Sequence, residues 1–417
     1  MKKAIFLFLG FLLISFLSFA QNTPYLKPGN WKGVIYRLDG NSVPFSFNIA
    51  LVKDKTIITL INAEELIIVD DFKKQSSDSL LITLPYFNAS FEVATYNADQ
   101  LEGYYIKTLN GKQIKASFIA NWNQPRFIDY KPSKYDASGT WDVLLTNNQT
   151  NKIMQSVGTF KQNVEGKVTG SFLTPTGDYR FLEGLVSGDT LKLSAFDGER
   201  VIYFEGRFIN STTIIEGKLI AGFGGSSKWE AKANPTAKLP NEYDYSKMRP
   251  GNTKLDFKFK DLDGKIVSLT DDEFKNKVVV IQLFGSWCPN CMDETRFITD
   301  YYKKNRSRGV EVIALAYERY DNPLEANFAL KKYKKQFGIQ YPILDTGVEP
   351  SDPFKAEKSL PQIDKIAGYP STIFIDRKGE VRKIHTGFSG PATGQFYTQY
   401  ISNFNKYMDE LIAEKLN

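Results

Sequence analysis

Apolar and polar residues alternate in short stretches from about residue 22 to residue 233, and Gly, Asn or Asp interrupts them. Alternation with period two places every second side chain on one face, which is typical of strands with one buried face. Turn-forming pairs such as Asp39-Gly40, Asn110-Gly111, Ser187-Gly188 and Asp197-Gly198 separate the stretches, as expected of antiparallel hairpins. This part of the chain predicts an all-β region, with strands at residues 46–52, 56–60, 80–84, 115–120, 190–195 and 201–208.

The β region also contains an internal repeat. A Gly-x-Trp triplet opens each half, at Gly29-Asn30-Trp31 and at Gly139-Thr140-Trp141, and a second Trp closes each half, at Trp122 and Trp229. A repeat of about 100 residues is a whole small domain, so we expect two related barrel- or sandwich-like modules. Module 1 covers residues 21–130 and module 2 covers residues 131–235. Residues 78–80 match residues 189–191, and residues 101–103 match residues 215–217.

The opening triplets resemble the Gly-x-Trp pattern of lipocalins, in which the Trp closes one end of a small ligand-binding barrel. A pattern of three residues is short, and Trp is highly buried on average whatever its role. We therefore interpret Trp31 and Trp141 as core residues and keep a ligand cavity as the alternative.

After a linker rich in proline at residues 236–250, strands and helices alternate. The order is strand-helix-strand followed by strand-strand-helix, which predicts a three-layer α/β domain over residues 251–417. The expected elements are hairpins at residues 256–260 with 266–269 and 372–376 with 381–385, strands at 277–284 and 310–317, and helices at 289–304, 324–337 and 395–414.

The first twenty residues form a separate segment. Lys2 and Lys3 precede an apolar run over residues 4–19, which ends in Ser18-Phe19-Ala20. A positive start, an apolar run and small residues before the cleavage point predict a secretory signal peptide over residues 1–20. The alternative, a transmembrane anchor, needs about 20 apolar residues, and this run is shorter. We expect the protein to be exported to the periplasm and to be soluble after the segment is removed.

The composition excludes several classes of protein. The 417 residues are 42% apolar and 24% charged, enough to bury large cores. The formal net charge of +6 is spread along the chain without a dense basic cluster, so nothing indicates nucleic-acid binding. One His and two Cys are too few for the usual metal-ligand sets. We expect no metal and no cofactor other than a redox-active disulfide.

The two cysteines lie in the segment Trp287-Cys288-Pro289-Asn290-Cys291, directly after a predicted buried strand and at the start of a predicted helix. Unpaired N–H groups and the helix dipole favour a thiolate at this position. Cys288 is expected to be the exposed attacking thiolate, and Cys291, one turn further, is expected to resolve the mixed disulfide. Half a metal site and a packed thiol pair are the alternatives, although no second CxxC and no His cluster supports a metal.

This segment resembles the active site of the TlpA/ResA-like thiol–disulfide oxidoreductases, which have a thioredoxin fold. Gly368-Tyr369-Pro370-Ser371-Thr372, placed before a strand, and Gly387, placed after the next strand, extend the resemblance. It implies that Pro370 is a cis-proline facing the cysteine pair. It also implies that Trp287, Pro289, Tyr369 and Pro370 contact the substrate.

The resemblance assigns Glu294 the handling of the proton of Cys291, with a solvated helix-surface carboxylate as the alternative. Two positions depart from the family pattern. Gln282 stands where thioredoxins carry a buried Asp, and Arg296 stands where many members carry Pro. The lone histidine, His385, is interpreted as an ordinary strand residue. Residues 340–360 are longer than a minimal thioredoxin needs and are expected to shape the substrate groove.

The implied activity is disulfide exchange with client proteins that carry thiols or disulfides, with a membrane thiol transporter as electron donor. The neutral Pro-Asn dipeptide lacks the His of strongly oxidising relatives, which favours a reductant. Two other functions remain as alternatives. An AhpC/TSA-like peroxidase would carry Thr where Gly285 stands. In a ligand- or client-binding β-barrel protein, the redox domain would be regulatory.

Overall fold

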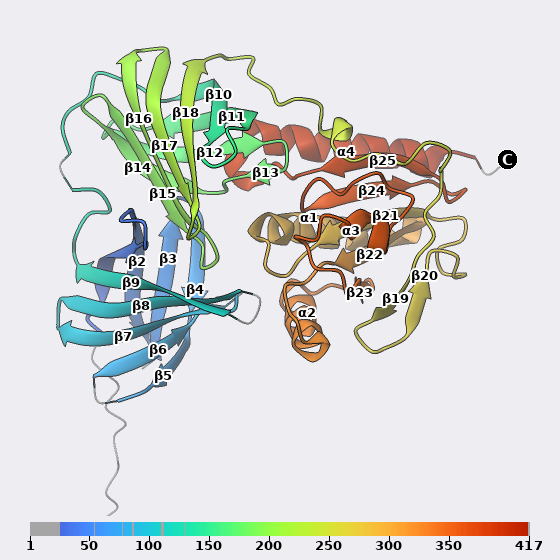
Figure 1. Cartoon of the computed structure of the whole chain (residues 1–417), viewed down its shortest axis with the longest axis horizontal. Helices are drawn as coiled ribbons and strands as arrows, with labels where there is room; N and C mark the ends of the chain where they lie inside the picture. The colour runs from blue at the N-terminus through green and yellow to red at the C-terminus, as the bar shows by residue number, and fades with distance from the viewer. Residues whose placement is uncertain are drawn as a thin grey trace, which may run out of the picture.

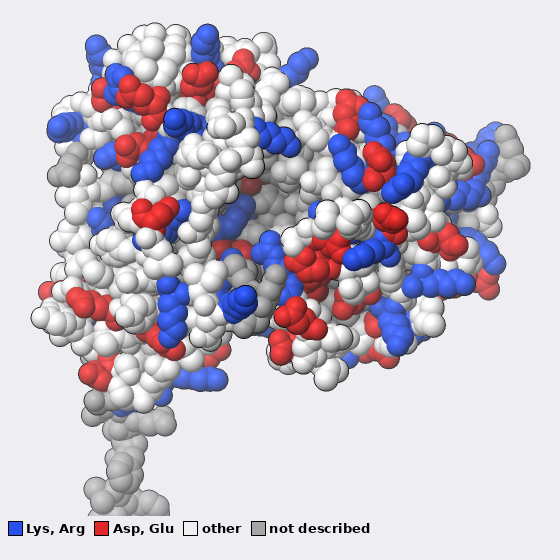
Figure 2. All heavy atoms as spheres, in the orientation of Figure 1, with Lys and Arg blue, Asp and Glu red and all other residues white. Residues whose placement is uncertain are grey.

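The computed structural model describes residues 26–415, apart from residues 54, 77, 86, 110, 111 and 129. The expected signal peptide and the Asn110-Gly111 turn lie outside the described residues. Two all-β modules, at the left of Figure 1, precede an α/β domain at the right. Acidic and basic side chains are interspersed over the face that Figure 2 shows.

Module 1 is a nine-stranded antiparallel sheet with the order β4-β3-β2-β1-β9-β8-β7-β6-β5. Buried and more exposed side chains alternate along its strands, as in β2, because successive residues point to opposite faces. The rings of Phe45, Phe91 and Phe118 meet inside it. The strands are β1 (Gly29–Tyr36), β2 (Ser42–Val52), β3 (Lys55–Asn62), β4 (Glu65–Val69), β5 (Asp71–Lys74), β6 (Ser79–Thr83), β7 (Ala89–Asn97), β8 (Gln100–Leu109) and β9 (Lys112–Trp122).

Module 2 has a second nine-stranded sheet, with the order β11-β10-β18-β17-β16-β15-β14-β12-β13. Because β11 also pairs with β12, the sheet closes into a barrel. The strands are β10 (Gly139–Asn147), β11 (Ile153–Gln162), β12 (Lys167–Thr174), β13 (Gly177–Asp178), β14 (Leu182–Ser187), β15 (Thr190–Phe196), β16 (Val201–Asn210), β17 (Thr213–Ala221) and β18 (Gly225–Ala233). The turn at Gly222-Phe223-Gly224-Gly225 joins β17 to β18.

The two opening tryptophans occupy equivalent places. Trp31 and Trp141 are each 1% exposed in the first strand of their module. Each donates its indole N–H to the carbonyl four residues earlier, at 2.9 Å. Because both are buried, Trp31 and Trp141 are core residues, as interpreted from the sequence. A cavity of about 20 Å³ between the aromatic rings of module 1 is large enough for about one water molecule and far too small for a lipid.

The expected match between Trp122 and Trp229 is wrong. Gly103 pairs with Phe118 in module 1, and Gly217 pairs with Trp229 in module 2, so Trp229 is equivalent to Phe118. Trp122 lies at the end of β9, nearer the surface, where its indole N–H donates to the carbonyl of Pro28 at 3.0 Å. The two closing residues share a type but differ in position, because Trp229 fills the interior and Trp122 lies at the end of a strand.

The C-terminal domain has a seven-stranded sheet with the order β20-β19-β23-β22-β21-β24-β25. β21 runs parallel to β22 and antiparallel to β24. Every strand and helix expected here forms, whereas β23 and α3, in residues 340–360, were not predicted. The elements are β19 (Lys258–Asp261), β20 (Ile266–Ser268), β21 (Val278–Phe284), α1 (Pro289–Asn305), β22 (Val310–Ala316), α2 (Pro323–Phe337), β23 (Ile343–Asp345), α3 (Lys355–Ser359), β24 (Ser371–Ile375), β25 (Val381–Thr386) and α4 (Gln395–Ala413).

All seven residues of β21 are buried because the sheet is covered on both faces. One face, with Val278 and Val280, shares a core with residues of α1, α2 and α4 such as Ile298, Leu330 and Phe404. The other face, whose core includes Val279 and Ile281, packs against α3 and irregular segments near residues 255–257 and 360–366. The predicted fold class, an all-β region followed by a three-layer α/β domain, is confirmed.

The segment expected to be a linker packs against the α/β domain. Its short 3-10 helix, Glu242–Asp244, lies beside β25, and Met248 forms an isolated bridge with Ile363. The Ser246 hydroxyl accepts the N–H of Ala367 at 3.2 Å. Within the part of the chain that the structure describes, none of the helices combines the length and apolar character needed to cross a membrane.

Candidate active site

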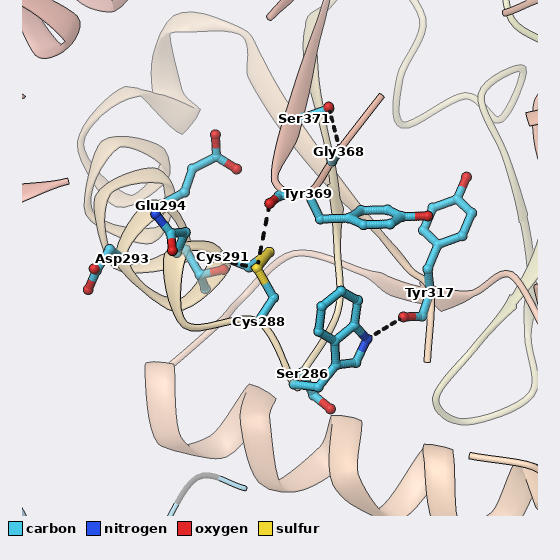
Figure 3. The surroundings of a disulfide bond; sticks show 12 residues. Ser286, Cys288, Cys291, Asp293, Glu294, Tyr317, Gly368, Tyr369 and Ser371 are labelled. Carbon is cyan, nitrogen blue, oxygen red and sulfur yellow. Dashed lines mark hydrogen bonds between the residues drawn. A yellow bond between two sulfur atoms is a disulfide. The ribbon is translucent and has the colours of Figure 1, made fainter. Parts of the chain in front are cut away.

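The cysteine pair forms a disulfide at the N-terminus of α1 (Figure 3). Cys288 is the N-cap residue, its backbone is extended, and its Sγ accepts the N–H of Cys291 at 3.2 Å. Pro289 occupies the first turn, where a missing N–H removes no helical hydrogen bond. The Cα atoms of the two cysteines are 5.2 Å apart, a usual separation for a disulfide. The pair is thus held at the end of a helix whose dipole stabilises a thiolate.

Two aromatic residues and a proline complete the surroundings of the disulfide. The Tyr369–Pro370 peptide bond is cis, as the resemblance implied. The carbonyl oxygen of Tyr369 lies 3.7 Å from the Sγ of Cys288 (Figure 3). Trp287 donates its indole N–H to the carbonyl of Tyr317 at 2.8 Å, and its ring meets the Tyr369 ring edge-on at 5.9 Å. The structure therefore brings Trp287, Cys288, Tyr369 and Pro370 together, as expected.

The expectation that Cys288 is exposed is wrong. Its side chain is only 5% exposed, and Cys291 is completely buried. Module 2 reaches the neighbouring residue of the motif: Asn290 donates its amide to the carbonyl of Asp178 at 3.0 Å and accepts a hydrogen bond from Arg200 at 2.9 Å. The start of α1 is therefore covered by another module, a contact that the local sequence does not indicate.

Glu294 is a buried residue, and the solvated-surface alternative is wrong. It is 0% exposed, its Oε2 accepts the amide of Gln282 at 2.8 Å, and its Oε1 accepts the hydroxyl of Thr372 at 2.7 Å. Burial raises the pKa of Glu294 from 4.5 to about 7, and the two hydrogen bonds only partly oppose this effect. Gln282, which cannot ionise, thus holds a carboxyl group that can.

Asp293 leaves α1 in a different direction from Glu294 (Figure 3). Its carboxylate forms a bidentate ion pair with Arg180 of module 2, with Nε–Oδ2 and Nη2–Oδ1 distances of 2.7 and 3.1 Å. Arg296, the second departure from the family pattern, donates to the same carboxylate at 2.7 Å. Asp293 therefore joins α1 to module 2.

A further buried carboxyl group beside the motif, that of Glu318, was not predicted from the sequence. Glu318 accepts the backbone N–H of Ser286 at 2.8 Å and its hydroxyl at 2.7 Å, and burial raises the pKa of Glu318 to about 7. The next residue, Arg319, lies over the Trp287 ring at 3.6 Å and within 3.6 Å of Glu199 in module 2. These two residues lie two and three positions after the end of β22, which pairs with β21. This position near adjacent strand ends is the one signal that could have indicated them.

His385 lies in β25 opposite Thr372, with its ring 5.0 Å from that of Tyr400. Burial lowers the pKa of His385 to about 4, so the imidazole is neutral at physiological pH. The interpretation as a structural strand residue fits this burial. Its Nδ1 lies 4.0 Å from the nearest carboxylate oxygen of Glu242, and the neutral imidazole carries no charge to pair with it.

A CxxC disulfide at the N-terminus of a helix that follows a buried strand, with a cis-proline beside it, defines a thioredoxin-like oxidoreductase. Comparison with known proteins gives the family. The Redoxin family matches residues 249–398. The thiol-disulfide oxidoreductase ResA of Bacillus thuringiensis subsp. konkukian (strain 97-27) is 32% identical over 136 residues, covering 32% of this chain and 68% of that protein. ResA of Halalkalibacterium halodurans is 29% identical over 145 residues, covering 34% and 72%.

Among solved structures, a thiol:disulfide interchange protein of the thioredoxin family from Chlorobium tepidum TLS is 24% identical, with a TM-score of 0.30, and the match covers 40% of this chain and 99% of that one. The family assignment rests on the similarity to the ResA proteins. This chain belongs to the TlpA/ResA-like thiol–disulfide oxidoreductases, and its C-terminal α/β domain is the thioredoxin-fold domain.

Proposed function

We propose that this protein is an exported reductant that exchanges disulfides with client proteins through Cys288. The observation that carries the proposal is the Cys288–Cys291 disulfide at the N-terminus of α1, with the carbonyl of Tyr369 3.7 Å from the attacking sulfur. This carbonyl belongs to the residue before a cis-proline and points at the reacting atom. A client backbone that donates to it would be held with its own sulfur next to Cys288.

The reaction proceeds in two exchanges. The Cys288 thiolate attacks one sulfur of a client disulfide, a Cys288–client bond forms, and the other client sulfur leaves as a thiolate. Cys291 then loses its proton and attacks the Sγ of Cys288, which releases the second client thiolate and forms the internal disulfide. Two electrons pass to the client. A dithiol donor must return them, and a membrane thiol transporter is the class of donor that fits an exported protein.

Each neighbour of the disulfide has a role in this scheme. Cys288 gains a thiolate-stabilising N–H from Cys291, and the Arg319 guanidinium adds positive charge over Trp287. Trp287 and Tyr369 supply flat apolar surfaces for the client chain. Glu294, with a pKa of about 7, can take a proton at physiological pH and is the proposed acceptor for the Cys291 proton.

Reduction of insulin disulfides tests the activity. The wild-type protein should reduce insulin with an external dithiol, and Cys288→Ala should abolish this turnover. Turnover that persists in Cys288→Ala would show that the mechanism is wrong.

The direction of electron flow has its own test. A reductant needs a Cys288–Cys291 couple with a reduction potential near or below the roughly −200 to −270 mV of glutaredoxins and thioredoxin. A value near the roughly −120 mV of DsbA would make the protein an oxidant. Equilibration with a glutathione or dithiothreitol redox buffer measures the potential.

A further inference from the structure

A hairpin of module 2 packs against the C-terminal domain next to the disulfide. It consists of the end of β12, the two-residue tip Pro175-Thr176 and the short strand β13 (Gly177–Asp178), followed by Tyr179 and Arg180. We call residues 174–180 the cap hairpin. In Figure 1, β13 projects from module 2 toward the C-terminal domain.

The cap hairpin contacts three segments near the disulfide. At the loop before the cis-proline, an added Cβ on Gly368 would lie 3.0 Å from the Thr176 side chain. At the loop after β25, an added Cβ on Gly387 would lie 2.8 Å from the N atom of Gly177. At the start of α1, the carbonyl of Asp178 accepts the amide of Asn290. These contacts bring the hairpin backbone close to the cis-proline loop and to the start of α1, which are the two segments beside the disulfide.

Polar contacts hold the cap hairpin in this position. Asp178 accepts the backbone N–H of Gly390 through Oδ2. Arg180, in the left-handed backbone region at φ 56°, pairs with Asp293 of α1 and with Glu65 of module 1. Because all these groups are largely buried, breaking one partner leaves a charge without compensation. The Arg180 contacts therefore hold the cap hairpin against the first turns of α1, next to the disulfide.

We propose that the cap hairpin is a built-in competitor for the client groove, so that the protein acts on extended, unfolded client segments that can replace it. This inference rests on the proposed function and names the substrate class of the same site. When the hairpin leaves, the N–H of Gly390 and the amide of Asn290 lose their acceptors. A client has to provide carbonyl or carboxylate oxygens there and a small residue beside Asn290, as Gly177-Asp178 does. A folded surface has no free strand to place in the groove.

The first test measures access to the disulfide in the full-length oxidised protein. A dithiothreitol thiolate attacks Cys288, the bond to Cys291 breaks, and the second dithiothreitol sulfur completes the reduction. Acid quenching and alkylation of the freed thiols give the rate by mass spectrometry. Arg180→Ala should raise this rate by at least about tenfold, equivalent to about 1.4 kcal/mol. Gly177→Ala should also raise it, because the new Cβ would lie 3.0 Å from Asn290 Nδ2 at a backbone φ of 131°.

Arg207→Ala is the matched control, since this arginine lies in module 2 but pairs only at the surface, with Glu216. It should leave the rate unchanged. Thermal melting shows whether each variant is folded, and Gly177→Ala serves if Arg180→Ala does not fold. Equal rates in the folded variants and the wild type would overturn the inference and leave the proposed function intact.

The second test compares a short disulfide-bonded peptide with a folded disulfide protein as oxidant of the reduced enzyme. The wild type should prefer the peptide, and Arg180→Ala should narrow the difference in kcat/KM by about tenfold or more. A preference of the same size in both proteins contradicts the inference. Faster dithiothreitol reduction in the variants without turnover of either substrate would instead overturn the proposed function.

Discussion

Replacing Glu294 by Gln tests the proposed proton transfer because the change removes the ionisable group and keeps the size of the side chain. In the folded protein this carboxyl has a pKa of about 7, raised from 4.5 by burial. The difference corresponds to about 3 kcal/mol between the two protonation states. Between these pH values the folded state binds a proton that the unfolded state does not. The stability present below about pH 4.5 is therefore lost as the pH rises through about 7.

Two quantities should change in Glu294→Gln. The stability of the variant relative to that of the wild type should therefore increase by about 3 kcal/mol between pH 4 and pH 8, because only the wild type loses this stability as the pH rises. The resolving step should slow by about a hundredfold or more at pH 7, since general-base catalysis contributes roughly 10²–10⁴. Its rate should also lose the rise centred near pH 7. Attack by Cys288 should change little. Stopped-flow kinetics on a preformed mixed disulfide separates the two steps.

Glu318→Gln is the matched control. Glu318 is also buried, and its pKa is also raised to about 7, but its carboxylate bonds to Ser286 rather than to Gln282 and Thr372. Glu318→Gln should change the pH dependence of stability in the same sense as Glu294→Gln. It should leave the pH dependence of the resolving step unchanged. A folded Glu294→Gln protein with a wild-type resolving rate and pH profile would refute the role of Glu294.

Three further predictions concern the fold. As the pH falls from 6.5 to 4, His385→Phe should lose less stability than the wild type, by up to about 3 kcal/mol. The reason is that the imidazole gains a proton in the unfolded state over this range but stays neutral in the folded state, where its pKa is about 4. Parallel pH–stability curves from urea unfolding would contradict this. Gly217→Ala should destabilise module 2 by more than about 1 kcal/mol, since its Cβ would lie 2.2 Å from a carbonyl oxygen. Gly224→Ala, with open space around it, should change stability by less than about 0.5 kcal/mol. Equal melting temperatures of the two variants would show that the backbone at Gly217 can move to accept the Cβ. Residues 21–235 and 247–417 should each unfold cooperatively when expressed alone, and adding residues 236–246 to the second fragment should raise its melting temperature; a molten fragment 247–417 would mean that it depends on the modules.

The elements of the fold follow from local patterns, which is why most could be predicted. The period-two alternation of the modules and the apolar run of β21 are repeated signals over many residues. In the C-terminal domain, the strand and the α-helix that were not predicted, β23 and α3, have three and five residues, too few for a periodic signal. The wrong equivalence of Trp122 and Trp229 arose because residue type was matched where sheet register decides the position.

The cysteine pair and the cis-proline could be predicted because their chemistry is tied to a short motif. The burial of Cys288 could not, since it depends on contacts between distant parts of the chain. Arg180 and Asp293 are 113 residues apart, and no feature near either one indicates the other. Glu318 was missed for a related reason: a carboxyl group after a strand is ordinary until the neighbouring strand end places Ser286 against it.

The central claim is that clients are reduced through a bond to Cys288, and trapping that bond tests it most directly. In Cys291→Ala the resolving thiol is missing, so a client disulfide should leave a stable mixed disulfide. Non-reducing electrophoresis and peptide mapping by mass spectrometry should place the client on Cys288. In Cys288→Ala, the remaining thiol of Cys291 should form such adducts far more slowly. Absence of any adduct in folded Cys291→Ala, or adducts formed equally well by Cys288→Ala, would contradict the account.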